Sequence, residues 1–398
     1  MTTKKILIFS TLPSYPYWEG SEMLWYNFIT NESVREKIDS HVVLAESSVT
    51  REKGKTFNAL GMSVDFYTPY STRFVTRNIL KTAQKLGFLE ETYASWYKKI
   101  ESIKPDLAFF NLAKVEDYVL LSFATDLCQK HNIPYWLVLQ GAPDFYFDGD
   151  EKSDALFRRV VEGAQRNIFQ SEKNRICIEK AVGKRLTNFF VTRNGLTQDF
   201  IDKAQATAEK YPVYTEGKVR ILSLGRVQPT VKGQHILLET LSSPIWKERD
   251  WEINFVGGGE KFLLERFIKY YEIAPEKVKI TDKVSDVFPI IGNSDLMLVP
   301  SVFEGTPLTA IEGMACARAV VGTPAGAMPE VIIDGETGWM ASAVTVEAFS
   351  EALERAWTVR ECWTEVGKRA RQKIVVEYNQ TNYIPALLEI LLKDLKIK

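Results

Sequence analysis

Short apolar segments alternate with longer amphipathic segments along the 398-residue chain. A short apolar run bounded by turn residues indicates a buried strand, whereas apolar residues three and four positions apart indicate a helix. In the first half of the chain the expected strands are residues 5–10, 41–46, 64–68, 107–111, 135–140, 167–171 and 188–192. Helical spacing follows several of these runs, for example over residues 22–30 and 115–130.

A second series of the same kind occupies the rest of the chain. Its expected strands are residues 219–225, 252–258, 278–282, 295–300, 319–324 and 338–342. Two successive series of strand, helix and strand predict two doubly wound α/β domains with mostly parallel sheets. Residues 194–218 are polar and weakly periodic, so we interpret them as the connection between the domains. Residues 381–398 have the pattern of an amphipathic helix.

The composition narrows the class of protein. The chain is 45% apolar and 25% charged, as in ordinary globular proteins. Its net charge of −1 creates no overall basic field, so we do not expect nucleic acid as a partner. No apolar run approaches the roughly 18 residues of a membrane-spanning helix, and the first run is too short for a signal peptide. The four widely spaced cysteines form no CxxC pair, which favours a reducing cytoplasm.

The segment SVFEGTPLTAIEGMA, residues 301–315, combines a loop with a helix start. Pro307 suits the first position of a helix and Thr306 suits its N-cap. Glu304 would then stand in the loop just before the helix, and Glu312 in its second turn. A carboxylate would therefore lie on either side of the helix start.

The same helix start is a candidate anion site. The backbone N–H groups of Leu308 and Thr309 would be unpaired at a positive helix end. The segment GRVQPTVKG, residues 225–233, directly follows an expected strand and supplies Arg226 and Lys232, which suit a diphosphate. On this segment alone, the alternative that both are solvated loop cations is equally open.

Two further glycine-containing turns follow expected strands. In PYWEGSEML, residues 16–24, Gly20 permits close backbone approach at the start of a helix. Most turns of this kind simply connect a strand to a helix. VGGGE, residues 256–260, lacks the full GxGxxG fingerprint, so we do not expect a dinucleotide site there.

These motifs together resemble a known family. Residues 225–233, 256–260 and 294–340 resemble, in order, spacing and strand context, the carboxy-terminal domain of retaining GT-B glycosyltransferases. This is the group 1, or family 4, type, which contains sucrose synthases and phosphatidylinositol mannosyltransferases. The amino half is similar in fewer places, at residues 16–24, 164–172 and 192–200.

The resemblance implies a domain organisation. It implies the GT-B fold, in which two Rossmann-like domains face each other across a cleft. Residues 1–200 would form the acceptor domain and residues 201–377 the domain for the nucleotide sugar. A final helix over residues 378–398 would return to the first domain.

The resemblance also implies roles for individual residues. Glu304 would lie by the hydroxyls of the donor sugar, and Arg226 and Lys232 would hold the diphosphate; these three are the expected catalytic residues. Glu312 would accept hydrogen bonds from the ribose, and the backbone near Val284 would meet the base. The residues expected to bind the donor are Gly20, Val284, Gly305, Thr306, Pro307, Leu308, Thr309 and Glu312.

Two departures from the family pattern are visible. The glycine-rich turn has Glu19 before Gly20, where relatives usually have two glycines. Many relatives carry a histidine near the donor sugar at the place of Gln140, which we therefore interpret as a contact for the sugar or the acceptor. These departures keep a non-catalytic nucleotide-sugar binder open, and an epimerase on the same architecture is a further alternative.

The expected activity is transfer of a hexose, with retention of configuration, from a UDP-sugar to a saccharide or a lipid-linked saccharide. Family base rates favour UDP and glucose. We expect no cofactor and no metal, because two cations and a helix start can stabilise the leaving diphosphate. The resulting hypothesis is a cytoplasmic glycosyltransferase of polysaccharide or glycan biosynthesis.

Two other signals allow more than one interpretation. Basic residues recur every fourth position over residues 73–86, which would suit peripheral docking at the inner membrane face, although a solvated helix face is favoured. Asp148 and Asp150 resemble a metal motif, but acidic turns of this kind are usually solvated loops.

Overall fold

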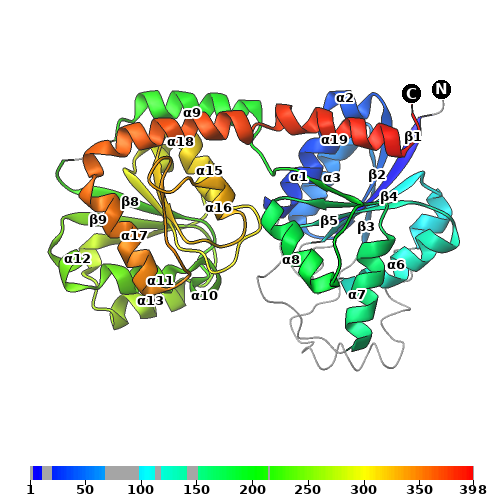
Figure 1. Ribbon diagram of the computed structural model, residues 1–398. Helices are drawn as coiled ribbons and strands as arrows, with labels where there is room; N and C mark the ends of the chain where they lie inside the picture. The colour runs from blue at the N-terminus through cyan, green and yellow to red at the C-terminus, as the bar shows by residue number, and fades with distance from the viewer. Residues whose placement is uncertain are drawn as a thin grey trace. The chain divides into compact units, whose positions relative to one another are not determined.

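The computed structural model describes residues 3–10, 20–67, 98–112, 118–140, 151–213 and 216–397 (Figure 1). The chain divides into two compact units. Unit 1 comprises Met1–Arg193 and Tyr383–Lys398, and unit 2 comprises Asn194–Asn382. Each unit has its own parallel sheet, as the two series of apolar runs predict.

Unit 1 contains a seven-stranded sheet in the order β3-β2-β1-β4-β5-β6-β7. Its strands are β1 (Lys4–Ser10), β2 (Ile38–Ala45), β3 (Ser63–Tyr67), β4 (Leu107–Leu112), β5 (Tyr135–Leu139), β6 (Arg166–Phe169) and β7 (Phe189–Val191). All neighbouring strands pair in parallel. Each strand predicted for the first series is therefore confirmed.

Helices cover both faces of this sheet because its strands are apolar on both sides. Its helices are α1 (Gly20–Thr30), α2 (Glu32–Arg35), α3 (Ser48–Ala59), α6 (Tyr118–Lys130), α7 (Glu151–Gly163) and α8 (Glu172–Val182). One core cluster contains residues of α6, α7 and α8. The other contains residues of α1 and α3 and of the C-terminal helix α19 (Gln380–Asp394).

The C-terminal helix α19 is fixed to unit 1 near its end by one buried carboxylate. Asp394 accepts hydrogen bonds from Arg166 Nη2 at 2.6 Å and from Trp136 Nε1 at 3.0 Å. The Asp394 side chain is only 6% exposed, so this ion pair is largely removed from water. The structure therefore assigns Tyr383–Lys398 to unit 1.

Unit 2 contains a six-stranded parallel sheet in the order β10-β9-β8-β11-β12-β13. Its strands are β8 (Val219–Leu224), β9 (Trp251–Val256), β10 (Val278–Thr281), β11 (Leu296–Val299), β12 (Ala319–Gly322) and β13 (Trp339–Met340). Its helices are α9 (Gln198–Lys210), α10 (Pro229–Lys232), α11 (Gln234–Leu241), α12 (Pro244–Glu248), α13 (Lys261–Tyr270), α14 (Phe288–Gly292), α15 (Leu308–Ala315), α16 (Met328–Val331), α17 (Val346–Thr358) and α18 (Trp363–Glu377). The second series of predicted strands is confirmed.

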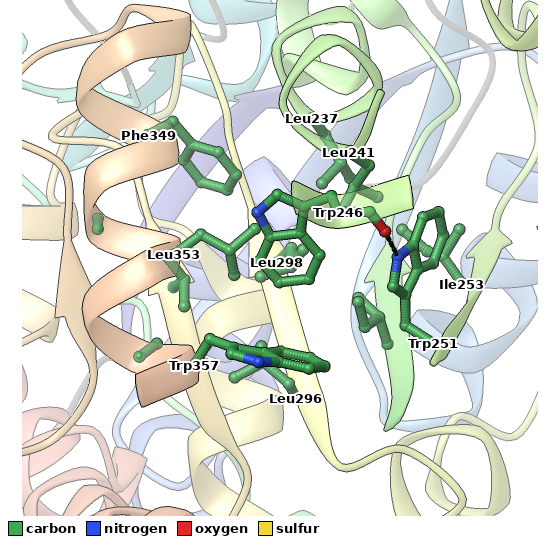
Figure 2. Packing of buried hydrophobic residues seen from close by; sticks show 14 of the residues in the cluster. Leu237, Leu241, Trp246, Trp251, Ile253, Leu296, Leu298, Phe349, Leu353 and Trp357 are labelled. Carbon is green, nitrogen blue, oxygen red and sulfur yellow. Dashed lines mark hydrogen bonds between the residues drawn. The ribbon is translucent and has the colours of Figure 1, made fainter. Parts of the chain in front are cut away.

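One core cluster of unit 2 is rich in tryptophan (Figure 2). Phe349, Leu353 and Trp357 lie four residues apart on α17 and form one apolar face. The rings of Trp357 and Trp246 meet edge to face, with their centroids 4.8 Å apart. Trp251 Nε1 donates a hydrogen bond of 2.6 Å to the carbonyl oxygen of Trp246, so this cluster contains a satisfied polar atom.

Residues 194–218 differ from the sequence-based interpretation as a simple connection. They contain the helix α9, which belongs to unit 2 and buries Ile201, Ala204 and Thr207. These three residues lie on one helix face, but the face is narrow and includes a polar residue. The weak periodicity therefore concealed a helix that packs in the unit 2 core.

Candidate functional site

The candidate site of unit 2 lies at the carboxyl edge of its sheet. β8 and β11 are neighbours at the centre of the sheet, and the strand order continues from them in opposite directions. At such a switch point the following loops diverge and leave a crevice in which open α/β sheets bind ligands. The predicted segments 225–233 and 301–315 follow these two strands.

Glycines let the loop after β8 run directly against the loop after β9. A Cβ atom on Gly257 would lie 1.9 Å from the carbonyl oxygen of Gly225, and one on Gly259 would lie 2.2 Å from that of Val227. Val227 N–H donates a hydrogen bond of 2.8 Å to the carbonyl oxygen of Gly258. The glycine cluster VGGGE therefore has a structural reason, which is contact between two backbones.

The loop after β8 is also joined to the loop after β11. Gly233 has a φ of 68°, and a Cβ atom there would lie 1.7 Å from the carbonyl oxygen of Pro300. Val302 N–H donates a hydrogen bond of 2.9 Å to the carbonyl oxygen of Val231. The short helix α10, which carries Lys232, is thus held against the segment that carries Glu304.

Lys232 and Glu304 form an ion pair of 2.7 Å between Nζ and Oε1. Ser301 Oγ donates a second hydrogen bond of 2.6 Å to the same carboxylate oxygen. Glu304 is 7% exposed, whereas the side chain of Lys232 is about a third exposed. Within the described ranges Glu304 Oε2 has no hydrogen-bond partner, so it can accept one from a ligand.

The start of α15 differs from the prediction by one residue. α15 begins at Leu308, and Pro307 occupies the N-cap with a ψ of 72°, outside the helical range. Leu308 N–H donates to the carbonyl oxygen of Thr306 at 2.9 Å, so it is not an unpaired donor. The assignments of Thr306 as N-cap, Pro307 as first helical residue and Leu308 N–H as unpaired are wrong.

The second predicted donor of this helix start, Thr309 N–H, makes no hydrogen bond to any other described residue. The side chain of Thr309 lies beside β8, because its Cγ2 is 3.7 Å from where a Cβ on Gly225 would stand. The first turn of α15 therefore adjoins the loop with Arg226, which is partly buried. Gln234 Nε2 fixes the backbone there with a hydrogen bond of 3.0 Å to the carbonyl oxygen of Arg226.

Glu312 lies in the second turn of α15, as predicted. Burial raises the pKa of its carboxyl from an ordinary 4.5 to about 7. Its side chain forms no hydrogen bond or ion pair with another residue in the part of the chain that the structure describes. A carboxylate that has lost water without gaining a partner is costly. Glu312 is therefore suited to hydrogen-bond donors from a ligand.

Val284 and Gly305 lie in loops at the same edge of unit 2. Val284 follows β10 and packs, partly buried, against the apolar cluster that contains α15. The carbonyl oxygen of Gly305 accepts a hydrogen bond of 3.0 Å from Ala327 N–H. The unit 2 residues of the predicted site therefore all belong to the loops, or to the first helices, that follow parallel strands.

Gly20 and Gln140 belong to unit 1. Gly20 is the first residue of α1, and Gln140 follows β5 with a side chain that is 5% exposed. Gln140 lies in a row of buried polar side chains with Glu22, Asn111 and Gln170, which sequence reasoning did not identify. The sequence feature that could have indicated this row is a single polar residue at or near the end of each apolar run. Such residues are common at strand ends, so the feature does not identify a site.

Several sequence-based hypotheses lie outside the described residues. These are the basic stretch at 73–86, the acidic turn at Asp148 and Asp150, and Glu19. Among the described residues, no group of three or more His, Cys, Asp and Glu side chains could hold a metal ion. No described helix is both long and apolar enough to span a membrane.

Comparison with known proteins shows which proteins the chain is similar to. Residues 218–358 match the family described as glycosyl transferases group 1. The chain is 24% identical over 274 residues to an uncharacterized glycosyltransferase of Methanocaldococcus jannaschii, a match covering 66% of this chain and 68% of that protein. It is 28% identical over 138 residues to the N-acetyl-alpha-D-glucosaminyl L-malate synthase of Bacillus anthracis, covering 34% of this chain and 36% of that protein.

A solved structure supports the fold over the whole chain. The structure of Anabaena HepE in complex with UDP has a TM-score of 0.74 and 16% sequence identity, covering 98% of this chain and 100% of that chain. Its likeness extends over both units and defines their fold as GT-B. Residues 218–358 are therefore similar to the group 1 glycosyltransferases, and the fold of the chain is that of GT-B proteins.

Proposed function

We propose that this chain is a retaining hexosyltransferase that moves glucose from UDP-glucose to a saccharide or a lipid-linked saccharide. The observation that carries the proposal is the 2.7 Å ion pair between Lys232 and Glu304, which joins the loops after β8 and β11 at the switch point. Solved structures of Anabaena HepE, a protein of the same fold, contain UDP or UDP-glucose, which supports this donor.

In this proposal the leaving diphosphate is stabilised by cations and a helix start. Lys232 uses one of its three N–H donors for Glu304, which leaves two for phosphate oxygens. Arg226 adds a planar guanidinium, and Thr309 N–H adds a donor at the positive end of α15. Charge develops on the diphosphate as the sugar–phosphate bond breaks, so these groups act most strongly in the transition state. No metal is required for this step.

Glu304 and Glu312 would bind different parts of the nucleotide sugar, the sugar and the ribose. Glu304, anchored through Oε1, would accept a hydrogen bond from a sugar hydroxyl through Oε2. Glu312 would accept hydrogen bonds from the ribose, and the backbone near Val284 would meet the base. No residue is assigned as covalent nucleophile, so the acceptor would attack from the face that the diphosphate leaves. The leaving phosphate would then take the acceptor's proton.

The remaining parts of the proposal concern the first unit and the cell. Gly20 would bring the backbone of α1 to the phosphates, and Gln140 would contact the sugar or acceptor. The protein would act in the cytoplasm, in polysaccharide or glycan biosynthesis. Unit 1 would bind the acceptor substrate.

Isothermal titration with UDP tests the diphosphate site. Lys232→Ala should weaken UDP binding at least tenfold, because it removes a partly buried cation. Lys203→Ala is the matched control, since Lys203 is a lysine of unit 2 that is paired with Asp199 on the exposed face of α9. Equal UDP affinity of the Lys232→Ala variant and the wild type would refute the site.

Product analysis tests the reaction itself. Incubation with UDP-glucose and an acceptor panel should yield a glycoside with the α configuration of the donor. A new nucleotide sugar formed without acceptor would instead identify an epimerase. Tight binding of UDP-glucose without transfer or hydrolysis would identify a non-catalytic binder.

A further inference from the structure

Four buried polar side chains lie in a line across the carboxyl edge of the unit 1 sheet. Ser10 ends β1, Asn111 lies near the end of β4, Gln140 follows β5 and Gln170 follows β6. These strands are consecutive neighbours in the sheet. Each of the four side chains is at most 6% exposed. Glu22 of α1 reaches the same edge and is also buried.

Hydrogen bonds join these side chains into one row that begins at Glu22. Glu22 Oε1 accepts from Asn111 Nδ2 at 3.3 Å, and Asn111 Oδ1 accepts from Gln140 Nε2 at 2.5 Å. Gln140 Oε1 in turn accepts from Gln170 Nε2. The other carboxylate oxygen of Glu22 accepts from Ser10 Oγ at 2.8 Å and from the indole N–H of Trp25.

The charge of Glu22 gives this row its direction. An amide side chain can be turned around so that its oxygen and nitrogen exchange places, and a row of amides alone has no preferred direction. An ionised carboxylate can only accept hydrogen bonds, so Asn111 must turn its NH₂ group toward Glu22. The oxygen of Asn111 then faces Gln140, which must donate to it, and Gln140 in turn must accept from Gln170.

Gln140 is the member of the row with capacity for a ligand. It uses one N–H for Asn111 and one lone pair for Gln170, which leaves one of each among the described residues. Its own carbonyl oxygen accepts from Asn174 Nδ2 at 3.3 Å, which holds the backbone in place. A neighbouring donor and acceptor match a hydroxyl group, which both donates and accepts.

We infer that Glu22 and Asn111 are positioning residues that fix the direction of the Gln140 amide, and thereby the donor and acceptor that this edge offers to a sugar hydroxyl. The part that concerns the sugar rests on the proposed function. The direction of the row does not depend on it, because it follows from the chemistry of a carboxylate and three amides.

A row without coupling would make a different prediction. If Asn111 did not link positions 22 and 140, an isosteric exchange between carboxylate and amide would cost stability independently at each of them. A directed row instead couples its two ends through Asn111. Moving the carboxylate from Glu22 to position 140 would let Asn111 turn around and restore its hydrogen bonds to both positions.

A double-mutant cycle tests the direction. The variants are Glu22→Gln, Gln140→Glu and the double variant, studied well above pH 7, where Glu22 is ionised. Gln140→Glu alone places an acceptor-only group at each end of Asn111, so its melting temperature should fall by about 5 °C. Glu22→Gln in the same chain should restore most of that loss, with a strongly non-additive cycle.

UDP release from UDP-glucose tests the role in function. Gln140→Glu should lower kcat about tenfold and leave UDP affinity unchanged, and the double variant should recover part of that kcat. Additive losses of melting temperature would overturn the directed row, and a wild-type kcat in Gln140→Glu would overturn its role at a sugar. A wild type that binds UDP but releases none from UDP-glucose would refute the proposed donor, while the melting-temperature cycle would still decide the row.

Discussion

The carboxyl edges of the two sheets are held together in two different ways. In unit 2, three glycines bring backbones into contact, and two glutamates and Lys232 stand on the segments that these contacts hold. In unit 1, buried side chains of separate strands bind one another in a row. Backbone contact fixes position, whereas a row of side chains fixes the direction of hydrogen bonding.

Each edge also contains one glutamate whose pKa is raised, and the surroundings of the two differ. Burial raises the pKa of both carboxyls, Glu22 in unit 1 and Glu312 in unit 2, from 4.5 to about 7. Glu22 accepts hydrogen bonds from Ser10, Trp25 and Asn111, whereas Glu312 has no partner among the described residues. Glu22 is thus part of the protein's own network, and Glu312 is suited to a ligand.

The largest expected effect concerns backbone contact in unit 2. Gly233→Ala should lower the free energy of unfolding by about 3 kcal/mol or more, because the new Cβ would overlap the carbonyl oxygen of Pro300. Gly335→Ala is the control, since Gly335 has a similar φ of 77° with nothing within 4 Å of a Cβ, and should cost about 1 kcal/mol. Denaturant unfolding measures both, and equal losses would show that the contact is not what requires glycine.

A second effect concerns the anchored carboxylate. Glu304→Gln should lower kcat by about 100-fold and change UDP affinity little, since Glu304 would act on the sugar and not on the nucleotide. Ser301→Ala, which removes only the hydrogen bond to Oε1, should have a smaller effect. Steady-state kinetics with UDP-glucose measures both, and turnover of the Glu304→Gln variant at the wild-type rate would remove Glu304 from the mechanism.

A smaller effect is expected for the glutamate without a partner. Glu312→Ala should weaken UDP binding about tenfold, because the ribose hydroxyls lose a charged acceptor. Uridine diphosphate lacking both ribose hydroxyls should bind the variant and the wild type equally. A variant that still distinguishes the two ligands as the wild type does would show that Glu312 does not read the ribose.

The last comparison concerns the two glutamates with raised pKa, Glu22 and Glu312. Between pH 4.5 and 7 the folded protein keeps protons on Glu22 and Glu312 that the unfolded chain has released, so stability falls as the pH rises across this window. Each group contributes a slope of about 1.4 kcal/mol per pH unit. Glu22→Gln and Glu312→Gln should each remove the slope that its glutamate contributes to the free energy of unfolding. Denaturant unfolding measured over this pH range tests both variants. An unchanged slope in either variant would contradict the assignment of that carboxyl.

The helix α15 shows how much of the site the local sequence can predict. The motif predicted a helix from Pro307 with Glu312 in its second turn, and the helix and the place of Glu312 are confirmed, although the helix begins at Leu308. The signals missed that the backbone of Pro307 is not helical and that Leu308 N–H bonds back to Thr306. Proline fixes φ but leaves ψ free, so its presence near a helix start does not determine which residue begins the helix.

By itself, the sequence determined the strands, the two parallel-sheet units and the segments that line the edge of unit 2. These features are readable because strand burial produces apolar runs, and because close backbone contact admits only glycine at fixed positions. Only the tertiary structure decided that Lys232 and Glu304 pair, that residues 198–210 form a helix of unit 2, and that Glu22 directs an amide row. These features depend on contacts between residues far apart in the chain. A polar residue at the end of a strand does not indicate in the sequence which residue it will bind.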